Sequence, residues 1–142
     1  MKSVADLPDG ATVFLDTAPL IYHLKGGPLA ERFAALFERI DQGNIEVVVS
    51  AVTLAELMGG PLAAQNEVLA ARYQSALQDS PGWHLRSIDA GIAVLAARLR
   101  LRYKLRLPDA LQLATAVETR CLALVTHDDD FSRVKELPIL RR

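Results

Sequence analysis

Four acidic residues follow short apolar stretches or flank them, at places where strands of a sheet would end. Asp16 ends the run VFLD, and Glu56 follows VVVSAVTLA. Asp109 begins the helix-like run DALQLATAV, and Asp128 follows LALVTH. An open α/β sheet binds ligands at the edge where the carboxyl ends of its parallel strands meet. Carboxylate oxygens without a histidine or cysteine cluster favour a hard cation, so the sequence predicts a Mg²⁺ or Mn²⁺ site.

The elements that would position these acids alternate between strands and helices. Apolar runs predict strands at residues 12–15, 47–49, 83–87 and 122–125, with a short fifth strand at 139–140. Helical patterns cover 17–24, 29–42, 67–77, 90–103 and 108–119. A further helix begins near Val52 and is expected to break at Gly59-Gly60-Pro61. This alternation predicts an α/β fold with a mostly parallel sheet, in one domain over residues 1–142.

The composition narrows the function classes. Hydrophobic residues make up 51% of the 142 residues and charged residues 23%, which is typical of globular proteins. No apolar run approaches the roughly 20 residues that cross a bilayer, and residues 1–10 lack a signal-peptide core, so we expect no membrane association and a cytoplasmic location. One cysteine excludes an internal disulfide, and no Gly-x-Ser-x-Gly motif or phosphate-binding glycine loop is present.

Each acid also has an explanation that needs no metal. Asp16 stands where a helix N-cap belongs, and Glu56 follows Thr53 at the spacing of a capping box. Asp109 would stabilise the start of a helix through the macrodipole, and Asp128 begins a run of three aspartates, some of which would simply be solvated. Four such acids at one sheet edge would repel one another, and a divalent cation removes that penalty. The joint interpretation therefore favours a metal site.

A basic segment precedes Asp109. Between residues 98 and 106 the chain carries five cations and no acid, although the net charge of the whole chain is only −1. Arg98 and Arg102 fit a solvated helix face near a C-terminus. The other three cations could line an approach to Asp109 and contact phosphates of a nucleic acid: Arg100, Lys104 and Arg106.

Four segments resemble the signature blocks of PIN-domain ribonucleases: FLDTAPLIY at 14–22, SAVTLAE at 50–56, LPDALQLATA at 107–116 and LVTHDDDF at 124–131. The closest branch is that of the VapC-like toxins of type II toxin–antitoxin pairs. The blocks occur in the order and spacing of that family. His127 departs from the pattern, since asparagine or arginine is more familiar there, and its side chain is expected to face outward.

The resemblance implies a three-layer α/β/α domain around a parallel sheet of four or five strands. It also implies Mg²⁺- or Mn²⁺-dependent endonucleolytic cleavage of RNA, inhibition by a cognate antitoxin and a homodimer. Carried over by position, the three core acids and the more variable fourth are Asp16, Glu56, Asp109 and Asp128. Supporting positions that order the acidic pocket are Thr17, Thr126 and Asp130.

The functional hypothesis is hydrolysis of phosphodiester bonds by water activated at the bound ion, without a protein nucleophile. Two alternatives to a toxin nuclease remain open: an RNA-processing nuclease that has no antitoxin, and a non-catalytic module that binds RNA or protein. A receiver-like phosphoacceptor domain also places acids at strand ends, but it needs a lysine after its last strand. Lys135 follows only a loop-like stretch, which disfavours that class.

Overall fold

The computed structural model describes residues 1–142. A five-stranded sheet runs through its centre in the order β3-β2-β1-β4-β5, and all neighbouring strands are parallel. The strands are β1 (Ala11–Leu15), β2 (Ile45–Ser50), β3 (Trp83–Arg86), β4 (Ala123–Val125) and β5 (Ile139–Leu140). The predicted α/β class and the five parallel strands are confirmed.

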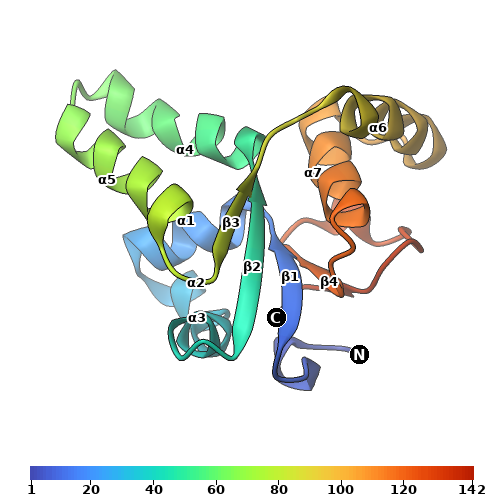
Figure 1. Cartoon of the computed structure of the whole chain (residues 1–142), viewed down its shortest axis with the longest axis horizontal. Coiled ribbons are helices and arrows are strands. Elements are labelled where there is room, and N and C mark those ends of the chain that lie inside the picture. The colour runs from blue at the N-terminus through green and yellow to red at the C-terminus, as the bar shows by residue number, and fades with distance from the viewer.

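Helices cover both faces of this sheet (Figure 1). Helices α1 (Thr17–Lys25), α3 (Ala34–Asp41), α4 (Ala51–Ala63) and α5 (Glu67–Asp79) contribute to the core on one face. Helices α6 (Ala90–Tyr103) and α7 (Leu107–Glu118) pack on the other face. Short helical turns complete the chain at η1 (Val4–Asp6), α2 (Pro28–Glu31) and η2 (Asp129–Phe131).

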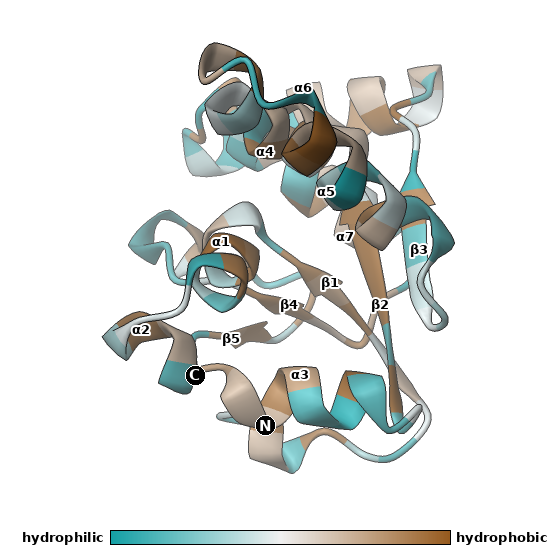
Figure 2. Ribbon diagram, turned by 90° about the vertical axis from the view of Figure 1, so that its left-hand side faces the viewer, coloured by the Kyte–Doolittle hydropathy of each residue, from teal (hydrophilic) through white to brown (hydrophobic).

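Alternation along the central strands explains the two cores. Val13 and Leu15 of β1 point into the α1 side, whereas Phe14 points into the α6–α7 side. Successive side chains of a strand point to opposite faces, so a strand buried on both faces must be apolar throughout. Strands β1, β2 and β4 follow this rule over most of their length, with the exposed Glu46 near the start of β2 as an exception, and they carry mainly hydrophobic colours in Figure 2.

Two helix boundaries differ from the sequence-based prediction. The predicted helix over 29–42 is two helices, α2 and α3, because the chain leaves helical geometry at Phe33, the N-cap of α3. The side chain of Phe33 is fully buried. The helical spacing of apolar residues continues across residue 33, so the sequence pattern could not reveal the break between α2 and α3.

The predicted break at Gly59-Gly60-Pro61 is also wrong, since α4 runs through all three residues. Pro61 lies in the last turn of this helix, cannot donate a hydrogen bond to the preceding turn, and is buried. Tertiary packing thus overrides the low helix propensity of these residues.

None of the helices combines the length and the hydrophobicity that crossing a membrane requires.

Candidate metal centre

Polar residues, most of them predicted from the sequence, gather at the carboxyl ends of the three central strands. Asp16 directly follows β1, Ser50 ends β2, and Thr126 directly follows β4. Helix α7 crosses this edge and brings Asp109 in its first turn, with Gln112 one turn later. The parallel topology therefore converges residues that lie far apart in the sequence.

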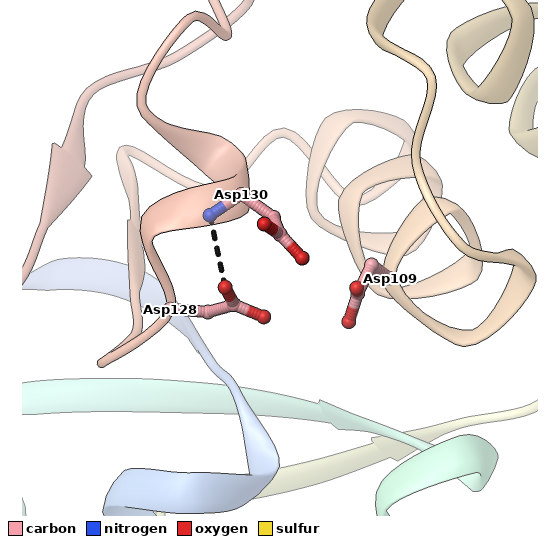
Figure 3. A group of neighbouring side chains, drawn as sticks. All are labelled: Asp109, Asp128 and Asp130. Atoms are coloured by element: carbon pink, nitrogen blue, oxygen red, sulfur yellow. Dashed lines mark hydrogen bonds between the residues drawn. The ribbon is translucent and has the colours of Figure 1, made fainter.

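Three carboxylates form the candidate ligand set. Asp109 of α7, Asp128 after β4 and Asp130 of η2 each offer one oxygen, and these oxygens lie within 4.8 Å of one another. Figure 3 shows Asp128 and Asp130 on one side of a gap and Asp109 facing them from the other side. We call these three residues the carboxylate group. Such an oxygen-only set suits Mg²⁺ or Mn²⁺ better than Zn²⁺.

Local backbone geometry fixes two members of the carboxylate group. Asp128 is the N-cap of η2, and its Oδ1 accepts a 2.9 Å hydrogen bond from the backbone N–H of Asp130. The hydroxyl of Thr126 in turn accepts a 3.0 Å hydrogen bond from the N–H of Asp128. The turn thus points both carboxylates toward α7. The sequence predicts only a supporting role for Asp130, because the run of three aspartates gives no sign of which side chains face α7.

The electrostatics of Asp109 reflect this crowding. Its side chain is only 10% exposed. Burial, together with the charges of Asp128 and Asp16, raises the pKa of Asp109 from its ordinary value of 3.8 to about 6, although the nearby Arg106 lowers it. A carboxylate that is buried beside other carboxylates holds its charge poorly without a cation.

Asp16 is held in a different way. Its Oδ2 accepts a 2.7 Å hydrogen bond from the Thr126 hydroxyl, and its Oδ1 accepts from the Thr17 N–H at 2.9 Å and from Gln112 Nε2 at 3.2 Å. The bond from Thr17 is an N-cap contact, so Asp16 also caps α1. Burial nevertheless raises its pKa, and the nearby charge of Asp128 contributes to that shift.

Gln112 links Asp16 to the neighbouring strands, and nothing in the sequence singled it out. Its Nε2 donates to Asp16, to the Thr53 hydroxyl at 2.8 Å and to the Thr17 hydroxyl at 3.3 Å. Its Oε1 accepts from the Ser50 hydroxyl, which fixes the orientation of the amide. We call this set the hydroxyl–amide network, and its members are Asp16, Thr17, Ser50, Thr53, Gln112 and Thr126.

Glu56 lies outside the carboxylate group. Its Oε1 accepts a 3.0 Å hydrogen bond from the Thr17 hydroxyl, so it joins the site through the network. The capping-box alternative is wrong for Glu56, because α4 begins after Ser50 and Thr53 lies inside the helix. The Glu56 carboxylate instead lines a groove of about 290 Å³ between α1, α4 and α5.

The basic segment divides into residues with different contacts. Arg102, which the sequence predicts to be solvated, instead pairs with Glu136 on the surface, with 2.9 Å between Nη1 and Oε1. Arg100 donates from Nε to the backbone carbonyl of Leu105 at 3.3 Å, and Lys104 is exposed at the end of α6. Arg106 alone contacts the carboxylate group, with its Nε 3.2 Å from Asp109 and its Nη2 3.9 Å from Asp128.

His127 packs inward, contrary to the outward orientation expected from the sequence. Its Nδ1 lies 2.9 Å from the Tyr22 hydroxyl, and its ring meets the buried Phe33 ring edge to face with 6.4 Å between centroids. The contacts of His127 with Tyr22 of α1 and with Phe33 at the start of α3 hold the residue that precedes the Asp128–Asp130 turn.

Comparison with known proteins agrees with this architecture. No curated protein matches the sequence. Among solved structures, a toxin–antitoxin complex from Klebsiella pneumoniae is 29% identical with a TM-score of 0.70, and the match covers 88% of this chain and 94% of that one. VapBC-5 of Mycobacterium tuberculosis, a member of the VapBC family of toxin–antitoxin systems, is 25% identical with a TM-score of 0.59, covering 93% and 99%.

A third similar structure is VapC20 of Mycobacterium tuberculosis, described as a sarcin–ricin loop cleaving toxin. It is 18% identical with a TM-score of 0.61, and the match covers 84% of this chain and 92% of that one, which shows a shared fold. The sequence itself matches the PIN domain family over residues 13–137. With the parallel sheet, the acids at its carboxyl edge and this match over most of its length, the chain belongs to the PIN domain family.

Proposed function

We propose that residues 1–142 form one nuclease domain that cleaves RNA endonucleolytically with Mg²⁺ or Mn²⁺, as the toxin of a toxin–antitoxin pair. The observation that carries this proposal is the carboxylate group of Asp109, Asp128 and Asp130 at the carboxyl edge of a PIN-family sheet. Oxygens from three side chains within 4.8 Å of one another suit a divalent cation.

Several acidic residues would bind the ion in different ways. Asp109 and Asp128 would bind it directly, with Asp130 beside them, and Asp16 and Glu56 would bind it directly or through water. When bound, the ion polarises the scissile phosphate and activates water for attack. Thr17 and Thr126 hold the Glu56 and Asp16 carboxylates in place, since each hydroxyl donates to one of them. No side-chain nucleophile is needed for this chemistry.

RNA is the proposed substrate. A polyanion suits a site with cations near it. Arg106 contacts Asp109, and Arg100 and Lys104 lie in the same segment, at the end of α6. The similar VapC20 structure is described as that of a toxin that cleaves the sarcin–ricin loop, which supports RNA as the substrate class without indicating the target here.

An antitoxin is the proposed partner. Two of the similar structures described above belong to toxin–antitoxin systems. The groove between α1, α4 and α5 has mainly apolar walls, including Ile21, Leu24 and Tyr73, with Glu56 at one side. An apolar segment of an antitoxin could occupy this groove, and a basic side chain could then reach Glu56. We also propose a homodimer, on the family resemblance alone.

The test is RNA cleavage by the purified protein. We expect cutting of structured RNA with Mg²⁺ or Mn²⁺, no cutting in excess chelator, and a loss of at least about a hundredfold in Asp16→Asn and Asp109→Asn, because each removes a charge from the site. Glu118→Gln is the matched control, since Glu118 is an exposed acid near the end of the helix that carries Asp109.

Full activity in the Asp109→Asn variant, or full activity in chelator, would contradict the proposal. Metal binding without any cleavage would instead favour the non-catalytic alternative. Activity without an inhibitory partner encoded beside this chain would favour the RNA-processing alternative.

A further inference from the structure

Arg106 occupies an unusual place beside the carboxylate group. It is the N-cap residue of α7, three positions before Asp109, and its side chain folds back over the first turn of that helix. Its guanidinium reaches across to Asp128, which comes from a different element of the fold. Arg106 therefore bridges the two sides of the gap seen in Figure 3.

The backbone around Arg106 is firmly held. Helix α6 ends at Lys104 in a left-handed conformation, with φ of 55°, and only Leu105 separates that residue from Arg106. The side chain of Leu105 is buried, its N–H donates to the Arg100 carbonyl at 3.3 Å, and its own carbonyl accepts from the Arg100 guanidinium. The position of Arg106 at the rim is thus set by the tight link between α6 and α7.

Arg106 contacts two of the three carboxylates that would hold a metal ion. Its Nε donates to Oδ2 of Asp109 at 3.2 Å, and its Nη2 lies 3.9 Å from Oδ2 of Asp128. Both carboxylates belong to the group whose oxygens lie within 4.8 Å of one another. A guanidinium and a divalent cation repel each other, so close binding of both to these oxygens is unfavourable.

We propose that Arg106 is an internal counterion that competes with the divalent cation for Asp109 and Asp128, and that its displaced guanidinium then binds a phosphate of the RNA. The second half of this proposal rests on the proposed function. The Arg106 side chain is 74% exposed, so it is free to turn away from the carboxylates. A guanidinium fork binds phosphate through two hydrogen bonds, which suits Arg106 to a substrate contact at this rim.

The effect of removing Arg106 on metal affinity distinguishes competition from a purely structural role. If Arg106 only supported the fold of the site, its removal would loosen the carboxylates and weaken metal binding. If it competes, its removal frees the Asp109 and Asp128 carboxylates and strengthens metal binding. The Arg106→Lys variant keeps the charge but loses the fork, so it separates the bridging contacts from a general effect of positive charge.

The experiment is a titration of the full chain with Mn²⁺, in which free Mn²⁺ is followed by electron paramagnetic resonance. We expect Arg106→Gln to bind Mn²⁺ roughly three- to tenfold more tightly than wild type, given the usual strength of exposed ion pairs. Arg106→Lys should lie between the two. Arg72→Gln, which removes the same charge from the exposed side of α5, should match wild type within about twofold.

A second experiment measures the kinetics of RNA cleavage. At saturating Mn²⁺, Arg106→Gln should raise the KM for RNA about tenfold and leave kcat nearly unchanged, as expected for the loss of one phosphate contact. Unchanged or weaker Mn²⁺ binding by Arg106→Gln would overturn the competition, and an unchanged KM would overturn the phosphate contact. Failure of wild type to bind Mn²⁺ would instead overturn the proposed function, and this inference with it.

Discussion

Two polar regions meet at the carboxyl edge of the sheet, and they satisfy their polar atoms in different ways. In the hydroxyl–amide network, Asp16 accepts hydrogen bonds from three donors, and Gln112 uses both ends of its amide. In the carboxylate group, Asp109 accepts a side-chain hydrogen bond only from the exposed Arg106. The first region is complete within the protein, whereas the second has negative charge that the protein neutralises only in part.

This difference indicates that the hydroxyl–amide network positions side chains, whereas the carboxylate group binds the cation. Buried polar networks that are fully paired hold their members in one arrangement, because any change leaves a polar atom without a partner. Crowded carboxylates instead destabilise the fold until a cation joins them. The network should therefore contribute to stability, and the carboxylate group should contribute to function at a cost in stability.

Among the substitutions, the largest expected change in the free energy of unfolding is in the hydroxyl–amide network. Gln112→Leu leaves Asp16, Ser50 and Thr53 with buried polar atoms that have lost a partner, so we expect a loss of about 3 kcal/mol in the free energy of unfolding. Thermal unfolding should show a fall of about 10 °C in Tm. The control is Gln74→Leu on the exposed side of α5, which should change the Tm by little. An unchanged Tm in Gln112→Leu would mean that the network does not support the fold.

Substitution in the carboxylate group should raise the free energy of unfolding instead of lowering it. Asp109→Asn in chelator at pH 8 removes a charge that the protein holds at a cost, so the free energy of unfolding should rise by about 2 kcal/mol. Asp16→Asn should not share this gain, because an amide replaces a carboxylate that accepts three hydrogen bonds. Glu118→Gln again serves as the control for the loss of one exposed acid. A lower stability of Asp109→Asn would show that Asp109 is mainly structural.

The same shift predicts a pH dependence. Because the pKa of Asp109 is raised to about 6, the folded protein binds more protons than the unfolded chain between pH 4 and pH 6. Its contribution to stability is therefore present below about pH 4 and is lost as the pH rises through about 6, by up to about 3 kcal/mol. Urea unfolding in chelator across this range measures the slope, which should be smaller in Asp109→Asn. An identical slope in the two proteins would contradict the raised pKa.

Much of the fold was predictable because its signals are local. Apolar runs such as residues 12–15, bounded by turns and followed by amphipathic helices, indicate a parallel sheet from the sequence alone. The errors at Phe33 and Pro61 arise where packing against distant elements decides the backbone. Local pattern carries no information about such contacts.

The site was predictable in part for the same reason. Asp16, Asp109 and Asp128 stand at strand ends or a helix start, so their shared edge follows from the topology. Gln112 resembles an ordinary helical residue, because its partners lie 59 to 96 residues away in the sequence. The approach of Asp130 to Asp109 and Asp128 depends on the hydrogen bond that its N–H donates to the Asp128 carboxylate, which residue types alone do not indicate.

The most direct test of the account is a crystal of the protein soaked in Mn²⁺ and measured by anomalous diffraction. We expect one anomalous peak between Asp109 and Asp128, about 2.1 Å from an oxygen of each, with the Arg106 guanidinium turned away from both carboxylates. The absence of a peak at saturating Mn²⁺, or a peak bound by other residues while Arg106 keeps its contacts, would contradict it.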